Sequence, residues 1–463
     1  MNKIKEVVPE KIFVILALIF GLLFVFITPP FQSPDENSHF LKAYSVSKGE
    51  FFPKVKDGKS GNYFSKEFYN YIQNKQKYLT DLEKKYSYSE LYNDQLLTIN
   101  YNDVELYSYS TQDVSPIFYI VPASGMVLGK IVMRIFDITG AGPTFLLYFS
   151  RIASLVFSIF IIYKAIKICP ILKKTISVIC LIPMTLFLFS MVTYDNLIIP
   201  MSILGLALML KLIYDNDYFF SKKNIFVLGV IALTLLNIKV FYSFIFILLF
   251  FIPKQKYGIK NKKILCIIFF ALLLVLLTFL LKIPNTIINS NINPVDSKSQ
   301  LSYLLHHPFK YLCVLFNSIK DNRLFLLSSI IGVFGLLDAY LPILIIFFYY
   351  IYLLILFISD GNKVKVDKRI KILMFLGCIA TFIGIFTIMY ISWTPSVVEN
   401  GAENTISGVQ GRYFLPLIFP FALIFVNNIE DNKFFNNIKK YYLIYPFVCL
   451  LITTFILMIR FWI

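Results

Sequence analysis

The chain has 463 residues, of which 57% are hydrophobic and only 15% carry a formal charge. Soluble globular proteins contain about 25% charged residues, so the composition excludes an ordinary soluble domain and indicates a polytopic membrane protein. The net charge of +17 is spread over short basic segments between apolar runs, which argues against nucleic-acid binding. The six cysteines show no disulfide or zinc spacing, so we interpret them as small core residues.

Long apolar runs follow one another along the chain, and about 20 helical residues are needed to cross a bilayer core. From hydropathy we predict about eleven transmembrane spans in a single all-α polytopic domain over residues 1–463. The spans are expected at 11–28, 143–166, 175–192, 196–212, 225–238, 240–253, 264–282, 341–359, 371–392, 413–427 and 441–461. Two interrupted apolar stretches, 116–135 and 324–338, are expected to lie at the membrane or dip into it. The first run lacks a cleavage site and is expected to be a retained span.

Basic residues concentrate in alternate loops, chiefly 164–174, 253–263 and 360–371, and at the N-terminus. Because Lys and Arg close to span ends stay cytoplasmic, these segments are expected inside the cell. Three loops are then expected on the opposite, extracytoplasmic face. The first is large, carries surface helices and covers 29–142, the second contains a dipping helix and covers 283–340, and the third covers 393–412.

The large loop begins with "PPFQSPDENSHF", which combines two adjacent carboxylates with a histidine. If a helix starts here, Asp35 and His39 lie one turn apart on the same face. Asp35 and Glu36 fit either a general base with its partner or part of a divalent-metal site. They fit equally well a helix N-cap beside a charge that favours the helix dipole.

Two short turns on the same predicted face carry further candidates. In "TYDN", Asp195 follows Tyr194 and either caps the next helix or contacts a cationic or hydroxylated substrate. In "NIKVFY", Lys239 precedes Tyr242 by three positions. A lysine on the outer face departs from the usual charge bias, so it either reaches toward lipid headgroups or binds a buried phosphate.

The later outer segments contain five more candidates. "HHPFKY" places His307 before a proline, where it serves proton transfer or belongs to a plain polar loop; the spacing of a zinc site is absent. "GVFGLLDAYLP" sets Asp338 in an apolar stretch, where an ionisable group suggests function. "ISGVQGRYFLPL" contains Gln410, Arg412 and Tyr413. The arginine suits bidentate phosphate binding, with interfacial anchoring as the alternative.

These motifs occur in a fixed order along nearly the whole chain: "SPDENSHF", "SPIFYIV", "YFSRIASLV", "IPMTLFLFSMVTYDN", "NIKVFY", "HHPFKY", "GVFGLLDAYLP" and "ISGVQGRYFLPL". Together they resemble a widespread bacterial family of predicted membrane proteins of unassigned function. That family in turn resembles the GT-C superfamily of integral membrane glycosyltransferases. The chain departs from the family pattern at "SPIFY", where a second proline is usual, and at "GLLD", where Trp-Leu is usual.

The resemblance implies a GT-C-like fold in the bacterial plasma membrane, with its active face extracytoplasmic. It implies inverting transfer of a sugar from a polyprenyl-phosphate donor to a cell-envelope glycan, with a catalytic acid in the first outer loop, here Asp35 or Glu36. The expected substrate-binding residues are His39, Tyr194, Asp195, Lys239, Tyr242, His307, Asp338, Gln410, Arg412 and Tyr413.

Metal dependence is left open, with Asp35 and Glu36 as the only suggested ligands. Expected partners are membrane lipids and the enzymes that make or flip the donor. Two alternatives stand beside the enzyme: a transporter or flippase of lipid-linked saccharides, and a non-catalytic scaffold for envelope assembly. A transporter commonly carries repeats and polar groups at the membrane midplane. The chain has no evident repeat, and its candidate groups are expected on one face, which favours the enzyme.

Overall fold

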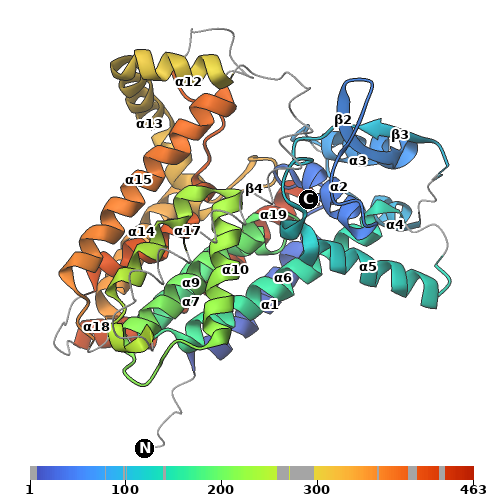
Figure 1. Cartoon of the computed structure of the whole chain (residues 1–463). Coiled ribbons are helices and arrows are strands. Elements are labelled where there is room, and N and C mark those ends of the chain that lie inside the picture. Colours follow the sequence, from blue (N-terminus) through green and yellow to red (C-terminus); the bar gives the residue numbers. More distant parts are fainter. Residues whose placement is uncertain are drawn as a thin grey trace, which may run out of the picture.

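A computed structural model describes residues 8–78, 80–96, 100, 102–138, 142–257, 271, 297–361, 364–394, 404–426 and 433–463. Helices make up most of this part of the chain (Figure 1). Within it, six helical runs are long and apolar enough to cross a membrane. They are α1 (Pro9–Ile27), η1 (Pro116–Tyr119) continued by α5 (Ile120–Ile135), α6 (Pro143–Ile168), α9 (Asp195–Tyr214), α15 (Lys368–Ser392) and α19 (Ile444–Phe461). The prediction of a polytopic α-helical membrane protein is thus confirmed.

The other predicted spans form shorter elements, so a count of eleven is not reached among the described residues. Pro183 starts a new helix where one span was expected, because proline cannot donate the hydrogen bond that would continue the preceding helix. The span expected at 264–282 lies outside the described residues except for residue 271. The shorter elements are α7 (Lys173–Cys180), α8 (Pro183–Phe189), α10 (Lys222–Ile238), η2 (Val240–Phe251), α14 (Ile343–Ser359), η4 (Gly411–Phe414), α17 (Leu415–Ala422) and η5 (Leu423–Phe425).

The stretch 116–135 was expected to dip into the membrane, but its helical run has the length and composition of a span. Its proline and glycines do not interrupt the helix. Pro122 lies in the first turn of α5, where an intrahelical donor is not needed. A Cβ on Gly125 would lie 2.5 Å from the Phe149 carbonyl oxygen of α6. The glycine therefore serves the close packing of α5 against α6.

The expected dipping helix at 324–338 is wrong in its second half. Helix α13 (Pro308–Ile331) ends there, and a short antiparallel hairpin follows, formed by β4 (Val333–Phe334) and β5 (Ala339–Tyr340). Gly335 and Leu337 both adopt positive φ angles, 64° and 69°. Because left-handed residues cannot continue a right-handed helix, the chain turns at this point.

A small polar subdomain follows α1 and lies at one end of the helical bundle (Figure 1). It contains a three-stranded antiparallel sheet that hydropathy did not predict. Asp57 and Gly58 have positive φ angles and form the two-residue turn of its first hairpin, as an Asp-Gly pair between strands favours. The elements are α2 (Glu36–Ser47), β1 (Lys54–Lys56), β2 (Lys59–Ser65), α3 (Lys66–Tyr78), α4 (Tyr88–Leu96) and β3 (Val104–Tyr107).

The C-terminus closes against this subdomain. The backbone N–H of Tyr86 donates to the carbonyl of Phe461 at 2.6 Å, and the indole N–H of Trp462 donates to the carbonyl of Ile27 at 2.7 Å. The ends of α1 and α19 therefore lie at the same end of the bundle.

The loops with many lysines lie at the other end. Lys174 donates to the carbonyl of Lys439 at 2.9 Å, and the backbone N–H of Thr175 donates to Asp360 at 2.8 Å. Segments that the charge pattern assigns to one face are thus brought together, while the assignment of that face to the cytoplasm stays a prediction. The remaining elements are η3 (Lys254–Tyr257), α12 (Ser297–His306) and α18 (Lys433–Lys440).

Candidate functional site

The start of α2 directs two adjacent carboxylates to different surroundings. Asp35 occupies the N-cap position in the left-handed conformation, with φ of 61°, and Glu36 is the first helical residue. Positive φ is uncommon for a residue with a side chain, although aspartate tolerates it better than most. As a result, the side chain of Asp35 is 56% exposed while that of Glu36 is fully buried.

Glu36 forms a fully buried ion pair with Arg151 of α6. The guanidinium Nε donates to Oε1 at 2.8 Å and Nη2 donates to Oε2 at 2.5 Å. The backbone N–H of Val192 also donates to Oε1. The remaining N–H groups of Arg151 donate to the carbonyls of residues 25, 28 and 29. All five donors of the guanidinium are therefore used, and the pair fixes α2 to the ends of α1 and α8.

The quoted motif "YFSRIASLV" contains Arg151, but sequence reasoning did not single this residue out. An arginine inside an apolar run is itself a signal, since a charge there requires a partner. Its partner lies 115 positions away, so the pairing needed the fold.

Asp35 faces a second arginine, Arg412, which lies in η4, the turn directly before α17. Nη2 of Arg412 donates to Oδ2 of Asp35 at 3.1 Å, and its Nη1 lies 3.9 Å from Oδ2 of Asp195. Arg412 is 4% exposed, yet its Nε and Nη1 have no hydrogen-bond partner among the described residues. The same holds for the buried Oε1 of Gln410. Buried polar groups are nearly always satisfied, so these unpaired atoms make the surroundings of Arg412 a candidate binding site for a polar ligand.

His39 lies beside this ion pair on α2. Its Nδ1 is 2.7 Å from the hydroxyl of Tyr119, and the edge of its ring packs on Tyr194 with centroids 4.9 Å apart. Burial lowers the pKa of His39 to about 4, against the opposing effect of Asp35 and with a further lowering from Arg412. The imidazole is therefore neutral at neutral pH. Tyr119 belongs to the quoted motif "SPIFYIV" but was not among the predicted site residues.

Lys239 and Tyr242 complete the group on its other side. The ammonium of Lys239 lies 3.5 Å from the ring centre of Tyr413 and 5.9 Å from that of Tyr194, a cation–π arrangement. Burial lowers the pKa of Lys239 to about 8, although Asp195 raises it. The hydroxyl of Tyr242 donates to the carbonyl of Tyr413 at 2.6 Å.

We call this group the Arg412 cluster. It unites two cations, two carboxylates, a neutral imidazole and several tyrosines from five separate parts of the chain. Its members are Asp35, His39, Tyr119, Tyr194, Asp195, Lys239, Tyr242, Gln410, Arg412 and Tyr413.

The match with a protein family covers all of these positions. A family model described as "Predicted membrane protein (DUF2142)" matches residues 18–420. The chain belongs to the DUF2142 family. No match was found among curated proteins or among solved structures.

Two predicted site residues of this DUF2142 chain have other surroundings. Asp338 accepts hydrogen bonds from Arg460 of α19, at 2.8 Å from Nε, and from the backbone N–H of Leu336. His307 is exposed between α12 and α13 and packs on Tyr303 with ring centroids 4.7 Å apart. Neither has a contact with the Arg412 cluster among those described.

The two carboxylates suggested as metal ligands do not converge, because Glu36 turns to Arg151 and Asp35 turns to Arg412. Among the described residues of this DUF2142 chain, no three His, Cys, Asp or Glu side chains lie close enough together to hold a metal ion.

An apolar groove begins next to the Arg412 cluster. It has a volume of about 540 Å³ and lies between α13, α14, α15 and α17. Phe414, two residues after Arg412, forms part of its wall, and Leu417 and Phe421 continue the wall along α17. Phe382 and Phe375 line it from α15. An apolar groove in a membrane protein suits a hydrocarbon chain.

Proposed function

We propose that this chain is a GT-C-type membrane glycosyltransferase. In this proposal it transfers a sugar from a polyprenyl-phosphate donor to a hydroxyl of an extracytoplasmic envelope glycan. The observation that supports this most is the buried Arg412, whose Nε and Nη1 have no described hydrogen-bond partner. A phosphate placed there would satisfy both nitrogens, as the planar guanidinium favours.

The surroundings of Arg412 match the two parts of such a donor. The ammonium of Lys239 lies on the ring of Tyr413, and in the proposal it adds a second positive charge beside the phosphate. The apolar groove that begins at Phe414 would receive the polyprenyl chain. A phosphate next to an apolar groove is the arrangement that a lipid-phosphate substrate requires.

In the proposed reaction, the carboxylate of Asp35 takes the proton of the acceptor hydroxyl while the acceptor oxygen attacks the anomeric carbon. The bond between that carbon and the phosphate oxygen breaks, and its electron pair stays on the phosphate. Arg412 and Lys239 stabilise the charge that develops on this leaving group. Attack from the side opposite the phosphate inverts the anomeric configuration.

The two acidic residues then have different roles. We assign the base to Asp35 because its side chain is 56% exposed and so can reach an acceptor. Glu36 is enclosed by Arg151 and Val192 and positions α2. Asp195 holds Arg412, and the neutral His39 orients the acceptor side of the site through its contact with Tyr119.

The position of the cluster favours an enzyme over a transporter. Asp195 is the first residue of α9, so the cluster lies at the end of a candidate span. Alternating-access transporters usually bind their substrate near the membrane midplane.

The test is glycan analysis of the envelope from cells that lack the protein and are complemented with variants. Asp35→Asn should insert normally but fail to restore the wild-type glycan profile. Asp217→Asn is the matched control, since Asp217 is exposed just beyond the far end of α9, and it should restore the profile. Full restoration by Asp35→Asn would overturn the proposal.

A binding measurement tests recognition of the donor's lipid phosphate independently of the transfer reaction. The purified protein should retain undecaprenyl phosphate in native mass spectrometry, and Arg412→Gln should lose this retention while Asp35→Asn keeps it. Equal retention by the wild type and Arg412→Gln would remove the proposed phosphate site.

A further inference from the structure

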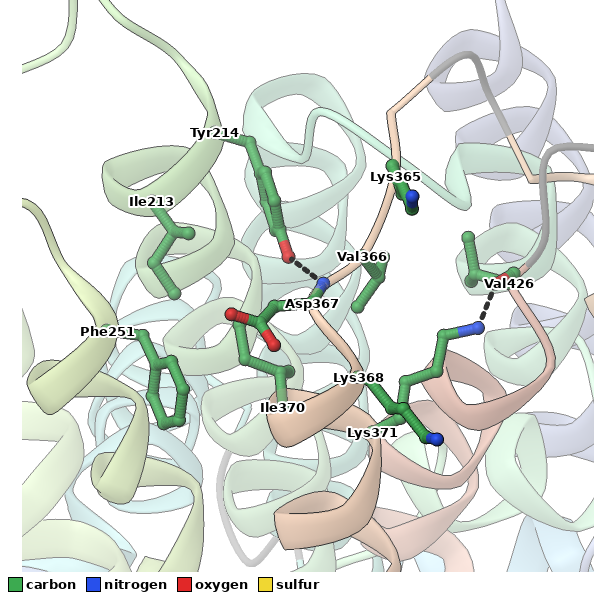
Figure 2. Close-up of a pocket in the computed structure, with 10 residues that line it drawn as sticks. All are labelled: Ile213, Tyr214, Phe251, Lys365, Val366, Asp367, Lys368, Ile370, Lys371 and Val426. Carbon is green, nitrogen blue, oxygen red and sulfur yellow. Dashed lines mark hydrogen bonds between the residues drawn. The ribbon is translucent and has the colours of Figure 1, made fainter.

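A second cavity lies at the opposite end of α9 from the Arg412 cluster. Helix α9 begins at Asp195 and ends at Tyr214, which lines this cavity (Figure 2). Its 20 residues rise about 30 Å, close to the thickness of a bilayer core. The cavity, with a volume of about 750 Å³, is therefore at the other membrane surface, which the basic loops predict to be cytoplasmic. We call it the basic cavity.

Three lysines at the start of α15 and just before it line the basic cavity: Lys365, Lys368 and Lys371 (Figure 2). Lys371 donates to the carbonyl of Val426. Lys365 and Lys368 are exposed and have no hydrogen bond or ion pair with any described residue. These two lysines leave a positive charge at the mouth of the cavity that no described group neutralises.

The carboxylate in the lining does not neutralise these lysines. Asp367 pairs with Arg369 at 2.9 Å and accepts the backbone N–H of the same residue, so it caps α15. The backbone N–H of Asp367 in turn donates to the hydroxyl of Tyr214 at 3.2 Å (Figure 2). The tyrosine proton stays available as a donor toward the cavity.

The lining of the basic cavity also contains apolar side chains, and they belong to η2 and α15, two elements with exposed apolar residues nearby. Phe251 and Ile370 line the cavity. Phe250, next to Phe251, is 56% exposed, and Ile372, two residues after Ile370, is 49% exposed. Large apolar side chains exposed beside a candidate span are suited to contact with lipid.

From these observations we propose that the basic cavity binds an anionic glycerophospholipid. Its headgroup phosphate would contact Lys365 and Lys368, and its acyl chains would follow the surface at Phe250 and Ile372. Basic pockets between membrane helices on the cytoplasmic side are suited to acidic headgroups. A soluble phosphate would use the lysines but gain nothing from the exposed apolar side chains of η2 and α15. This inference does not depend on the transferase activity.

The experiment compares lipid retention by the full-length protein in native mass spectrometry, with phosphatidylglycerol and phosphatidylcholine offered in equal amounts. The wild type should prefer phosphatidylglycerol. The double variant Lys365→Gln/Lys368→Gln should weaken this preference by about fivefold per lysine removed. The matched control is Lys222→Gln/Lys223→Gln, which removes two exposed lysines from the start of α10 at the same end and should keep the wild-type preference.

Three results would overturn the proposal. The first is a wild type without preference for phosphatidylglycerol. The second is an equal loss in both double variants, which would mean general surface electrostatics. The third is displacement of phosphatidylglycerol by millimolar inorganic phosphate, which would identify a soluble anion as the ligand. A thermal unfolding measurement without added lipid accompanies the experiment and should give the same midpoint for both double variants and the wild type.

Discussion

Asp35 and Glu36 are neighbours in the chain, and each faces an arginine, but the two ion pairs are built differently. Around Glu36, every donor of Arg151 is used and both partners are fully buried. Around Asp35, two nitrogens of Arg412 lack a described hydrogen-bond partner and the carboxylate is half exposed. The first pair is complete without a ligand, and the second is not.

We interpret this difference as one between a structural ion pair and a candidate ligand-binding one. A buried ion pair whose hydrogen bonds are all made holds elements together, and breaking it is costly because a lone charge remains. A buried arginine with unsatisfied donors costs folding free energy, which a bound anion would recover. The contrast therefore supports ligand binding at Arg412 and anchoring at Arg151. The predictions below test it from the largest expected effect to the smallest.

The largest effect is expected for Arg151→Met. This change leaves the fully buried Glu36 without its partner, so the free energy of unfolding should fall by about 3–5 kcal/mol. Thermal unfolding of the purified protein in detergent measures it. The double variant Glu36→Gln/Arg151→Met removes the lone charge and should recover part of the loss. A single variant as stable as the wild type would contradict the anchoring role.

Arg412→Lys should affect activity more than stability. Lysine keeps the positive charge between Asp35 and Asp195 but lacks the planar pair of donors for a phosphate. We expect transfer activity to fall by about 10²-fold or more, as when a stabilising donor is removed from a transition state. Glycan analysis and thermal unfolding on the same preparations check both parts. A loss of stability as large as that of Arg151→Met would mean that Arg412, like Arg151, mainly holds the fold together.

The class of fold and two residues of the second ion pair, Asp35 and Arg412, could be predicted from the sequence. Hydropathy located five of the six candidate spans among the described residues, because apolar runs of span length carry their own signal. The motifs drew attention to Asp35 and Arg412, which the fold brings within 3.1 Å across 377 positions. They did not separate Asp35 from Glu36. That separation depends on the left-handed backbone at Asp35 and on the distant Arg151, which are properties of the folded chain.

Two further features, a hairpin and the partner of Asp338, were not predicted from the sequence. The Asp57–Gly58 pair is a recognisable turn signal, but the strands beside it are short and polar, so a search for apolar runs does not detect them. Asp338 was predicted as a site residue because it is ionisable and lies in an apolar stretch, and in the structure its partner is Arg460, 122 positions away. A sequence signals that a charge needs a partner but does not name the partner.

The pH dependence of stability should report on His39, the neutral member of the cluster. Its pKa in the folded protein is lowered to about 4 from 6.5, so the unfolded chain binds more protons between these values. The contribution of His39 is complete above pH 6.5 and is lost as the pH falls toward 4. Between pH 7.5 and pH 5 the wild type should lose about 2 kcal/mol.

His39→Gln provides the control for this pH effect, because glutamine does not titrate in that range. Denaturant unfolding of both proteins at the two pH values measures the difference. The variant should show a flatter dependence, by about the same 2 kcal/mol. Parallel pH curves for the two proteins would mean that another group titrates, and His39 would no longer be the neutral imidazole of the cluster.

The smallest effect is expected for Tyr242→Phe, which distinguishes the cluster from ordinary packing. The hydroxyl of Tyr242 donates to the carbonyl of Tyr413 and so fixes the ring on which Lys239 rests. Its loss should lower stability by about 1 kcal/mol and activity by a few-fold. Tyr257→Phe removes a similar bond to the carbonyl of Leu249, far from the cluster. It should cost similar stability and leave activity unchanged, because only the first bond positions a cation at the proposed phosphate. Equal activity of the two variants would show that the Tyr242 hydroxyl does no more than support the fold.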